Sequence, residues 1–364
     1  MTRNDLDRFW ADDELAHRDN CFFDRAPQVA LGIRMSDECV YAELGEDGDP
    51  WAPEDPARRY DLNRRYNDKA ESVVGRRLLA EVPPEEAVPQ PAVRRIGEVF
   101  EGTYERGRKT GEWLHSPAST PAELEAMLDR VDRLDLADFM LPDDWAERET
   151  TPLLRHIRGP VTLATSIYGV EELIFLYFDA PELFERFSAT IARVVLEMAA
   201  ILDREAGYTE ETRPRGFSFA DDDCNLLTPE MYELFGFPIL KRVFDTYSPD
   251  PGDKRFQHSD SAMAHIVPIL GRLDLNGCNF GPTVLVNDIR PHLPHARIDG
   301  CLAPFTFINN DRDGIVAEVR RDCEAIKRSG TKGLNVATAG SINNGSSLES
   351  MLLVMETIVE YGRY

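Results

Sequence analysis

Apolar and polar positions along the chain follow two periods, one typical of helices and the other of strands. Over 181–202 apolar residues recur three and four positions apart, which predicts a long amphipathic helix. Short apolar runs such as 216–220 predict buried strands, and each run is followed by a helical segment. Because strands and helices alternate from about residue 117 onward, we expect parallel strands joined by crossover helices.

The same pattern places the individual elements. Strands are predicted at 28–33, 161–167, 216–220, 255–258, 273–280, 297–302 and 333–337. Helices are predicted at 62–79, 181–202, 262–270, 313–329 and 348–361, and two more start at the hydroxyl-capped segments 119–123 and 228–230. Residues 1–110 are otherwise irregular, since the Pro- and acid-rich stretches 47–56 and 81–91 predict loops.

This order of elements predicts an α/β fold, a single (β/α)8 TIM barrel with an irregular, partly helical N-terminal extension. We expect residues 1–110 to form the extension, packed on the barrel, and residues 111–364 to form its main body, as one structural domain. A doubly wound sheet would give the same alternation. The chain has no glycine-rich GxGxxG or P-loop turn after its strands, and this favours the barrel over a nucleotide-binding sheet.

Composition narrows the classes of partner and location. The formal net charge of the 364 residues is −24, so nucleic acid and anionic membranes are not expected to bind. The six cysteines include no CxxC pair, and the N-terminus has no apolar signal segment, so we expect reduced thiols and a cytoplasmic protein. No run of about 18 apolar residues predicts a transmembrane helix.

Three of the predicted strands end in polar clusters. These clusters are Asp221–Asp223, His258 with Asp260, and Thr338–Asn344. The C-terminal ends of barrel strands meet at one face, where catalytic groups converge, so the three clusters mark the expected site. Loops are polar by default, and each cluster alone is also compatible with an ordinary surface turn.

His258 and Asp260 are two positions apart on a strand, so they can project to the same side. An imidazole and a carboxylate placed in this way can bind a divalent metal, or act as a base and its orienting group. The alternative is an Asp that caps the next helix beside a histidine at the edge of the core.

Asp221, Asp222 and Asp223 are adjacent, and three buried ionised carboxylates would repel one another. At least one is therefore expected to face solvent, a cation or an arginine, or to have a raised pKa. The functional interpretation is a carboxylate that holds a substrate group, a metal or a proton. A solvated acidic turn is the alternative.

Two further turns are candidate substrate-binding segments. The loop that carries Ser341 and Asn343 can offer backbone N–H groups and a helix N-terminus to an anion. The turn that carries Asn279 and Gly281 follows a strand, and its glycine allows close backbone approach. A plain loop with a serine cap and simple turn chemistry are the respective alternatives.

Motifs spread over about residues 20–364 together resemble those of a known superfamily. They are Asp24-Arg25-Ala26-Pro27, Gly159-Pro160-Val161-Thr162-Leu163-Ala164, Asp221-Asp222, His258-Ser259-Asp260 and Tyr361-Gly362-Arg363-Tyr364. In order and spacing they are similar to motifs of the uroporphyrinogen decarboxylase superfamily, which includes zinc-dependent corrinoid methyltransferases. The resemblance implies a (β/α)8 barrel and makes a homodimer an expectation.

The chain departs from both catalytic patterns of that superfamily. The arginine-rich stretch that holds porphyrin carboxylates in the decarboxylases is absent from 28–34. Asp260 occupies the place of the first zinc-ligating cysteine of the methyltransferases, and Ser341 lies near the place of the second. The expected metal site is therefore a harder one, with His258 and Asp260 as ligands for zinc or another divalent ion, or a site with no metal.

The resemblance and the strand-end residues together predict a one-carbon (methyl) transferase that acts with a corrinoid or a methylated small-molecule donor. His258 and Asp260 would bind metal or steer protons, and Asp221 and Asp222 would position a substrate cation or donate a proton. Asp223, Asn279, Gly281, Ser341 and Asn343 are the expected substrate-binding residues. A small-molecule substrate and a corrinoid protein are the expected partners. The alternatives are a lyase that decarboxylates a small carboxylic acid and a non-catalytic barrel that binds a tetrapyrrole or corrinoid.

Overall fold

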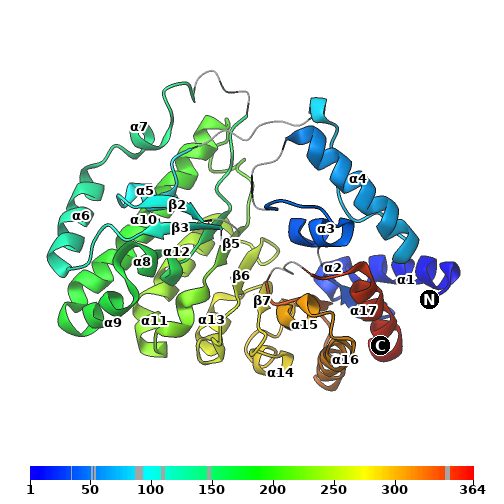
Figure 1. Ribbon diagram of the computed structural model, residues 1–364. Helices are drawn as coiled ribbons and strands as arrows, with labels where there is room; N and C mark the ends of the chain where they lie inside the picture. The colour runs from blue at the N-terminus through cyan, green and yellow to red at the C-terminus, as the bar shows by residue number, and fades with distance from the viewer. Residues whose placement is uncertain are drawn as a thin grey trace. The chain divides into compact units, whose positions relative to one another are not determined.

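The computed structural model describes residues 1–33, 35–50, 52, 55–86, 93–107, 111–145, 148, 150–340 and 345–364 (Figure 1). Among these residues the main sheet has seven strands, in the order β1-β9-β8-β7-β6-β5-β4. These strands are β1 Ala30–Leu31, β4 His156–Arg158, β5 Phe217–Ala220, β6 Arg255–Ser259, β7 Gly277–Phe280, β8 Arg297–Asp299 and β9 Leu334–Val336. The recorded pairings in this sheet are parallel, which confirms the α/β, barrel-type fold class.

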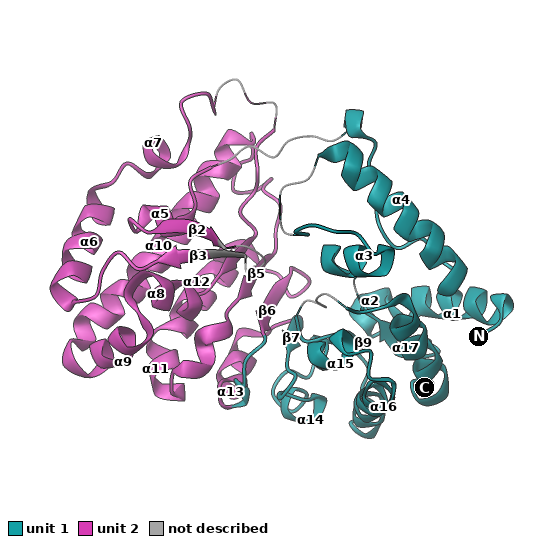
Figure 2. Cartoon of the chain, in the orientation of Figure 1, with its two compact units in different colours: residues 1–88, 260–264, 277–364 teal, residues 89–259, 265–276 magenta. Residues whose placement is uncertain are grey.

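Contacts divide the chain into two compact units (Figure 2). Unit 1 comprises residues 1–88, 260–264 and 277–364, and it holds β1, β7, β8 and β9. Its helices are α1 Arg3–Ala16, α2 Arg18–Cys21, α3 Asp37–Leu44, α4 Pro56–Val73, η1 Pro84–Glu86, α14 Val286–Ile289, α15 Pro304–Ile308, α16 Arg312–Arg328 and α17 Leu348–Tyr361. Helices α16 and α17 pack on each other through their apolar faces, with Ile326 and Val354 fully buried.

Unit 2 comprises residues 89–259 and 265–276, and it holds β4, β5 and β6. An antiparallel hairpin, β2 Thr103–Gly107 with β3 Gly111–His115, also belongs to it. Its helices are α5 Ile96–Val99, α6 Pro121–Arg133, α7 Leu136–Met140, α8 Val161–Tyr168, α9 Val170–Asp179, α10 Pro181–Glu205, η3 Asp222–Leu226, α11 Pro229–Leu234, α12 Gly236–Tyr247, α13 Val267–Leu270 and η5 Gly271–Leu273, and η4 Ala264–Ile266 begins at the unit boundary. The buried rings of Phe184 and Phe235 pack between α10 and α12, with their centroids 4.8 Å apart.

The apolar segment 161–167 was predicted as a strand, and this prediction is wrong because the segment forms α8. Almost all of its side chains are buried, the hydroxyl residues Thr162 and Thr165 included, so burial follows neither the period of a strand nor that of a surface helix. Pro160 stands directly before the helix in the αR conformation, a position that suits its fixed φ. The strand in this region is β4, five residues earlier than expected at its start.

Regular structure also occurs where the sequence predicted irregularity. Helix α1 begins with a capping box, in which the side chains of Thr2 and Asp5 each accept a hydrogen bond from the backbone N–H of the other residue. The hairpin β2–β3 lies within and beside the same N-terminal region. In the described part of the chain no single helix is long and apolar enough to span a membrane, and the apolar pair α8 and α9 bends by 96°.

His17 and Asp13 tie α1 to β1. Asp13 is buried, and its Oδ1 accepts the N–H of Leu31 at 2.7 Å. The Nε2 atom of His17 lies 3.2 Å from the carbonyl of Leu31 and 3.4 Å from Asp13 Oδ2. The hydrogen bond to Asp13 is the main reason why the pKa of His17 rises from its ordinary 6.5 to about 10.

We expect His17→Gln to lower the free energy of unfolding by about 1 kcal/mol at pH 6, a modest value because the imidazole is 42% exposed and solvent screens the pair. A raised folded-state pKa gives stabilisation that is complete below about pH 6.5 and is lost as pH rises through about 10. Urea denaturation of both proteins at pH 6 and above pH 10 checks this. A difference in stability that does not shrink at the higher pH would contradict it.

Candidate functional site

The end of β5 is anchored to α8 by a buried carboxyl. Asp221 is fully buried, and its Oδ1 accepts hydrogen bonds from the backbone N–H (2.8 Å) and the hydroxyl (3.1 Å) of Thr162. The backbone N–H of Asp221 donates to the carbonyl of His258 at 2.9 Å, which joins the ends of β5 and β6. Burial raises the pKa of Asp221 to about 7. Hydrogen bonds from the first turn of α8 stabilise the carboxylate and act in the opposite direction, but burial is the larger effect.

Asp222, the next residue, faces His258 across the two strand ends. Its Oδ1 lies 3.8 Å from His258 Nε2, and its Oδ2 lies 3.6 Å from Arg158 Nη2 on β4. Asp222 and His258 are both half-buried, with side chains 31% and 22% exposed. A carboxylate between an imidazole and a guanidinium is placed to hold a cation or to exchange protons with a substrate.

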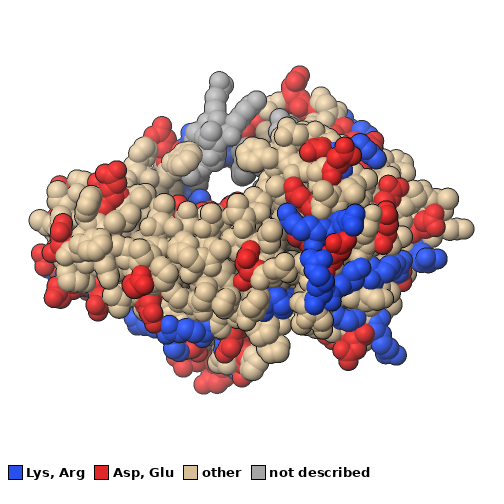
Figure 3. Space-filling model, turned by 90° about the horizontal axis from the view of Figure 1, so that it is seen from below, with Lys and Arg blue, Asp and Glu red and all other residues tan. Residues whose placement is uncertain are grey.

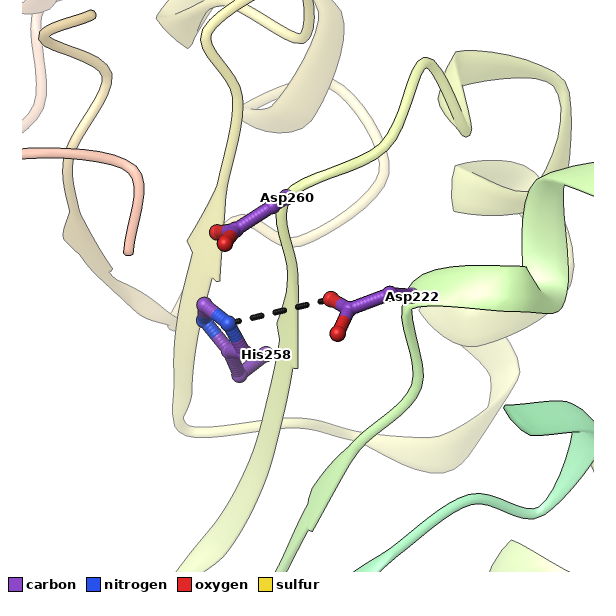
Figure 4. A group of neighbouring side chains, drawn as sticks. All are labelled: Asp222, His258 and Asp260. Carbon is purple, nitrogen blue, oxygen red and sulfur yellow. Dashed lines mark ion pairs between the residues drawn. The ribbon is translucent and has the colours of Figure 1, made fainter. Parts of the chain in front are cut away.

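Asp260, one residue beyond β6, completes a group of three. The ligand atoms of Asp222, His258 and Asp260 all lie within 4.8 Å of one another. Figure 4 shows the two carboxylates and the imidazole turned toward one another. The 3.8 Å between Asp222 Oδ1 and His258 Nε2 is compatible with two bonds of about 2.0–2.2 Å to one ion. Two carboxylates and one imidazole form a hard donor set that suits a divalent ion.

The three consecutive acids therefore occupy three different environments. Asp221 is buried beneath the turn, and Asp222 faces His258. Asp223 accepts a hydrogen bond from Thr165 Oγ1 at 2.6 Å, while its backbone N–H donates to Thr162 Oγ1 at 2.9 Å. Three adjacent carboxylates were expected to need different surroundings, and the structure shows which residue takes which.

A polar line within the strands was not predicted from the sequence. His156 Nδ1 and Lys254 Nζ lie 3.1 and 3.2 Å from the buried Ser218 Oγ. Burial, followed by the charges of Lys254 and His258, lowers the pKa of His156. The signal was present in Phe217-Ser218-Phe219, where one small hydroxyl residue between two apolar rings points to the opposite face of the sheet.

The predicted turn at Asn279 has a structural role in unit 1. The Asn279 side chain donates to the carbonyls of Asp299 and Thr338 (3.0 Å to the latter), and its Oδ1 accepts the N–H of Gly340 at 3.2 Å. These hydrogen bonds hold strand ends together, and contact of Asn279 with substrate stays a prediction. Gly281 has φ +140°, a conformation that favours glycine, and its approach to substrate stays a prediction.

The Ser341 loop is described only at its two ends, because Ser341 and Asn343 lie outside the described residues. Its first glycine, Gly340, lies against Asp260: a Cβ atom at this position would come within 2.5 Å of both Asp260 carboxylate oxygens. The loop therefore begins beside Asp260, one of the three members of the Asp222–His258–Asp260 group.

The parallel sheet and the helices between its strands are those of an α/β barrel-type protein, and Asp222, His258 and Asp260 lie at its strand ends. The uroporphyrinogen decarboxylase (URO-D) family model matches residues 96–361, so the chain belongs to this family. A methyltransferase from Methanosarcina mazei has a similar structure, with a TM-score of 0.55 and 16% sequence identity over 92% of this chain and 95% of that one. This likeness shows the shared fold. No curated protein matches the sequence.

Proposed function

We propose that this protein is a one-carbon transferase that moves a methyl group from a corrinoid or methylated small-molecule donor to an acceptor. Membership of the uroporphyrinogen decarboxylase family and the fold shared with a methyltransferase support an enzyme of this broad class. The observation that carries the proposal is the group formed by Asp222, His258 and Asp260 at the strand ends. We assign these three residues to a divalent metal, with zinc as the first candidate.

The donor set differs from one built on cysteine thiolates. All six cysteines are buried, and none belongs to the three-residue group. Oxygen-rich ligation suits zinc as well as harder divalent ions, so the residues present fit a metal. A metal bound there would supply a positive charge that lowers the pKa of an acceptor thiol or hydroxyl.

The surrounding residues position this group. Asp221 receives two hydrogen bonds from Thr162, and this fixes the turn from which Asp222 reaches His258. Arg158 lies 3.6 Å from Asp222, where it balances the charge of the carboxylate and can meet an anionic substrate. We assign Asp223 to the substrate side of this turn, because it lines a cavity that also contains Arg158.

Decarboxylation of a small carboxylic acid is the second candidate, and the position of Arg158 favours it. A guanidinium beside an imidazole can hold a substrate carboxylate while His258 supplies the proton that replaces it on carbon. The same residues would then act as an anion clamp and a proton donor, with no requirement for a corrinoid.

One experiment separates the candidates. Purified protein is stripped of metal, divided, and assayed with and without added zinc for methyl transfer from methylcobalamin to a thiol, followed by the visible spectrum of the corrinoid. We expect demethylation that depends on zinc. Absence of any spectral change with thiol and folate acceptors, together with CO₂ release from small carboxylic acids, would replace the first candidate with the second. Absence of both reactions would favour a non-catalytic corrinoid- or tetrapyrrole-binding protein.

A further inference from the structure

A cavity of about 560 Å³ lies within unit 2, beside β4, the last strand in the sheet order, and the hairpin β2–β3. Its volume falls in the range of roughly 300–1,000 Å³ that is typical of small-molecule sites. The apolar side of the cavity includes Leu163, Met198 and Leu202, none more than 4% exposed. These side chains form a preformed apolar surface for a ligand.

Aromatic residues of the hairpin line the same cavity. Tyr104 on β2 and Trp113 on β3 are among its lining residues, and the indole of Trp113 is 62% exposed. The guanidinium of Arg95 lies over the ring of Tyr104, 3.4 Å from its centroid. A large aromatic side chain that remains exposed at a cavity offers a flat surface on which a flat ligand can stack.

The charge of the cavity is opposite to that of the chain. The whole sequence has 65 acidic and 41 basic residues, yet among the described residues the lining contains three arginines, Arg94, Arg95 and Arg158, and one acid, Asp223. Asp223 is itself hydrogen-bonded to Thr165. Basic residues also gather locally elsewhere on this acidic protein, as the face in Figure 3 shows. Arginine side chains in a lining that also has apolar walls favour an anion that carries an apolar body.

Two lining residues connect the cavity to the strand-end group. Arg158 Nη2 is 3.6 Å from Asp222 Oδ2. The Thr162 hydroxyl donates a hydrogen bond to Asp221 and accepts one from the backbone N–H of Asp223. A ligand in the cavity therefore has one end beside the residues that we assign to chemistry.

We propose that this cavity binds the substrate, and that the substrate is a flat apolar anion of the class of aromatic carboxylates. Arg94, Arg95 and Arg158 supply the cationic partners for its acidic group, and Trp113 with the apolar wall covers its body. This inference names the substrate class of the proposed enzyme, and so it rests on the proposed function. The described residues that line the cavity all belong to unit 2.

Titration with 2-naphthoate, followed by tryptophan fluorescence and by calorimetry, tests the proposal on the full-length protein. We expect saturable binding, and at least about tenfold weaker binding to Arg95→Met, because a charge-assisted hydrogen bond contributes enough for such a loss. The uncharged 2-naphthylmethanol should bind at least about tenfold more weakly than the acid. Arg133→Met, which removes an exposed arginine of α6 outside the lining, should bind 2-naphthoate like the unaltered protein.

Trp113→Leu provides a second variant at an exposed position, and it should also weaken binding measured by calorimetry. The proposal is overturned if the unaltered protein shows no saturation, if acid and alcohol bind equally, or if Arg95→Met and Arg133→Met behave alike. His258→Ala distinguishes binding in the cavity from the proposed metal-dependent methyl transfer. Binding of 2-naphthoate that persists in this variant supports the cavity whatever the methyl-transfer assay shows.

Discussion

His258→Ala is expected to lower zinc affinity by at least about 100-fold and kcat/KM for methyl transfer by about 10³-fold. The expected loss of zinc affinity follows because removing even a residue that only hydrogen-bonds to a metal ligand costs about 10–100-fold in affinity. The expected loss of kcat/KM lies within the range of about 10²–10⁴ for loss of a positioned catalytic group. Without its imidazole, the group keeps only the carboxylates of Asp222 and Asp260. Equilibrium zinc titration and the methylcobalamin assay measure the two effects.

Matched controls distinguish loss of the site from general damage. His292→Ala removes an exposed histidine of unit 1, and Asp245→Asn removes an exposed acid that pairs with Lys241, so both should retain zinc affinity and activity. Asp222→Asn should resemble His258→Ala because it weakens the same group. Equal zinc affinity in His258→Ala and His292→Ala would refute the assignment of His258 to a metal.

Arg290→Met is expected to lower the free energy of unfolding by about 3 kcal/mol, because the buried carbonyls that Arg290 serves lose their donor at a cost of about 1–3 kcal/mol each. Arg290 is 5% exposed, and its Nη1 donates to the carbonyls of Leu293, Pro294 and Ala296, each at 2.9 Å. Its Nη2 donates to the carbonyl of Lys332 at 3.0 Å. Methionine fills a similar volume and leaves these carbonyls without their donor.

Urea denaturation measures this loss, with Arg312→Met, at an exposed position at the start of α16, as the matched control. Arg290→Lys should lie between the two, because an ammonium group keeps the charge but cannot reach four carbonyls with the fork of a guanidinium. If Arg290→Met and Arg312→Met unfold at the same urea concentration, the hydrogen-bond network does not carry the stability that we assign to it.

Periodicity predicted the elements whose two faces differ. Helix α10 was predicted at 181–202 and forms over Pro181–Glu205, because one of its faces is buried and the other carries charge. The run 161–167 could not be assigned correctly, since nearly all of it is buried and its short mixture of apolar and hydroxyl residues suits a strand as well as a helix. Family membership now supports the barrel-type fold that the strand–helix alternation predicted.

The candidate site was only partly visible in the sequence. Two-residue alternation singled out His258 and Asp260, and the acidic run singled out Asp222, because strand ends of a parallel sheet meet at one edge. The proximity of Asp222 to His258 depends on the register between β5 and β6, in which Ala220 pairs with His258, and register is a tertiary property. The cavity was missed for a similar reason, since its arginines and its aromatic residues come from separate segments.

Asp222 and His258 are remote in the sequence and neighbours in the fold, and this has a thermodynamic consequence. An ion that both residues ligate binds the native chain and has no equivalent site in the unfolded chain, so its binding free energy adds to the free energy of folding. Free ion at 100 times its dissociation constant would add about 2.7 kcal/mol. The melting temperature should therefore rise with zinc concentration, so that a thermal scan reports occupancy before any substrate is known.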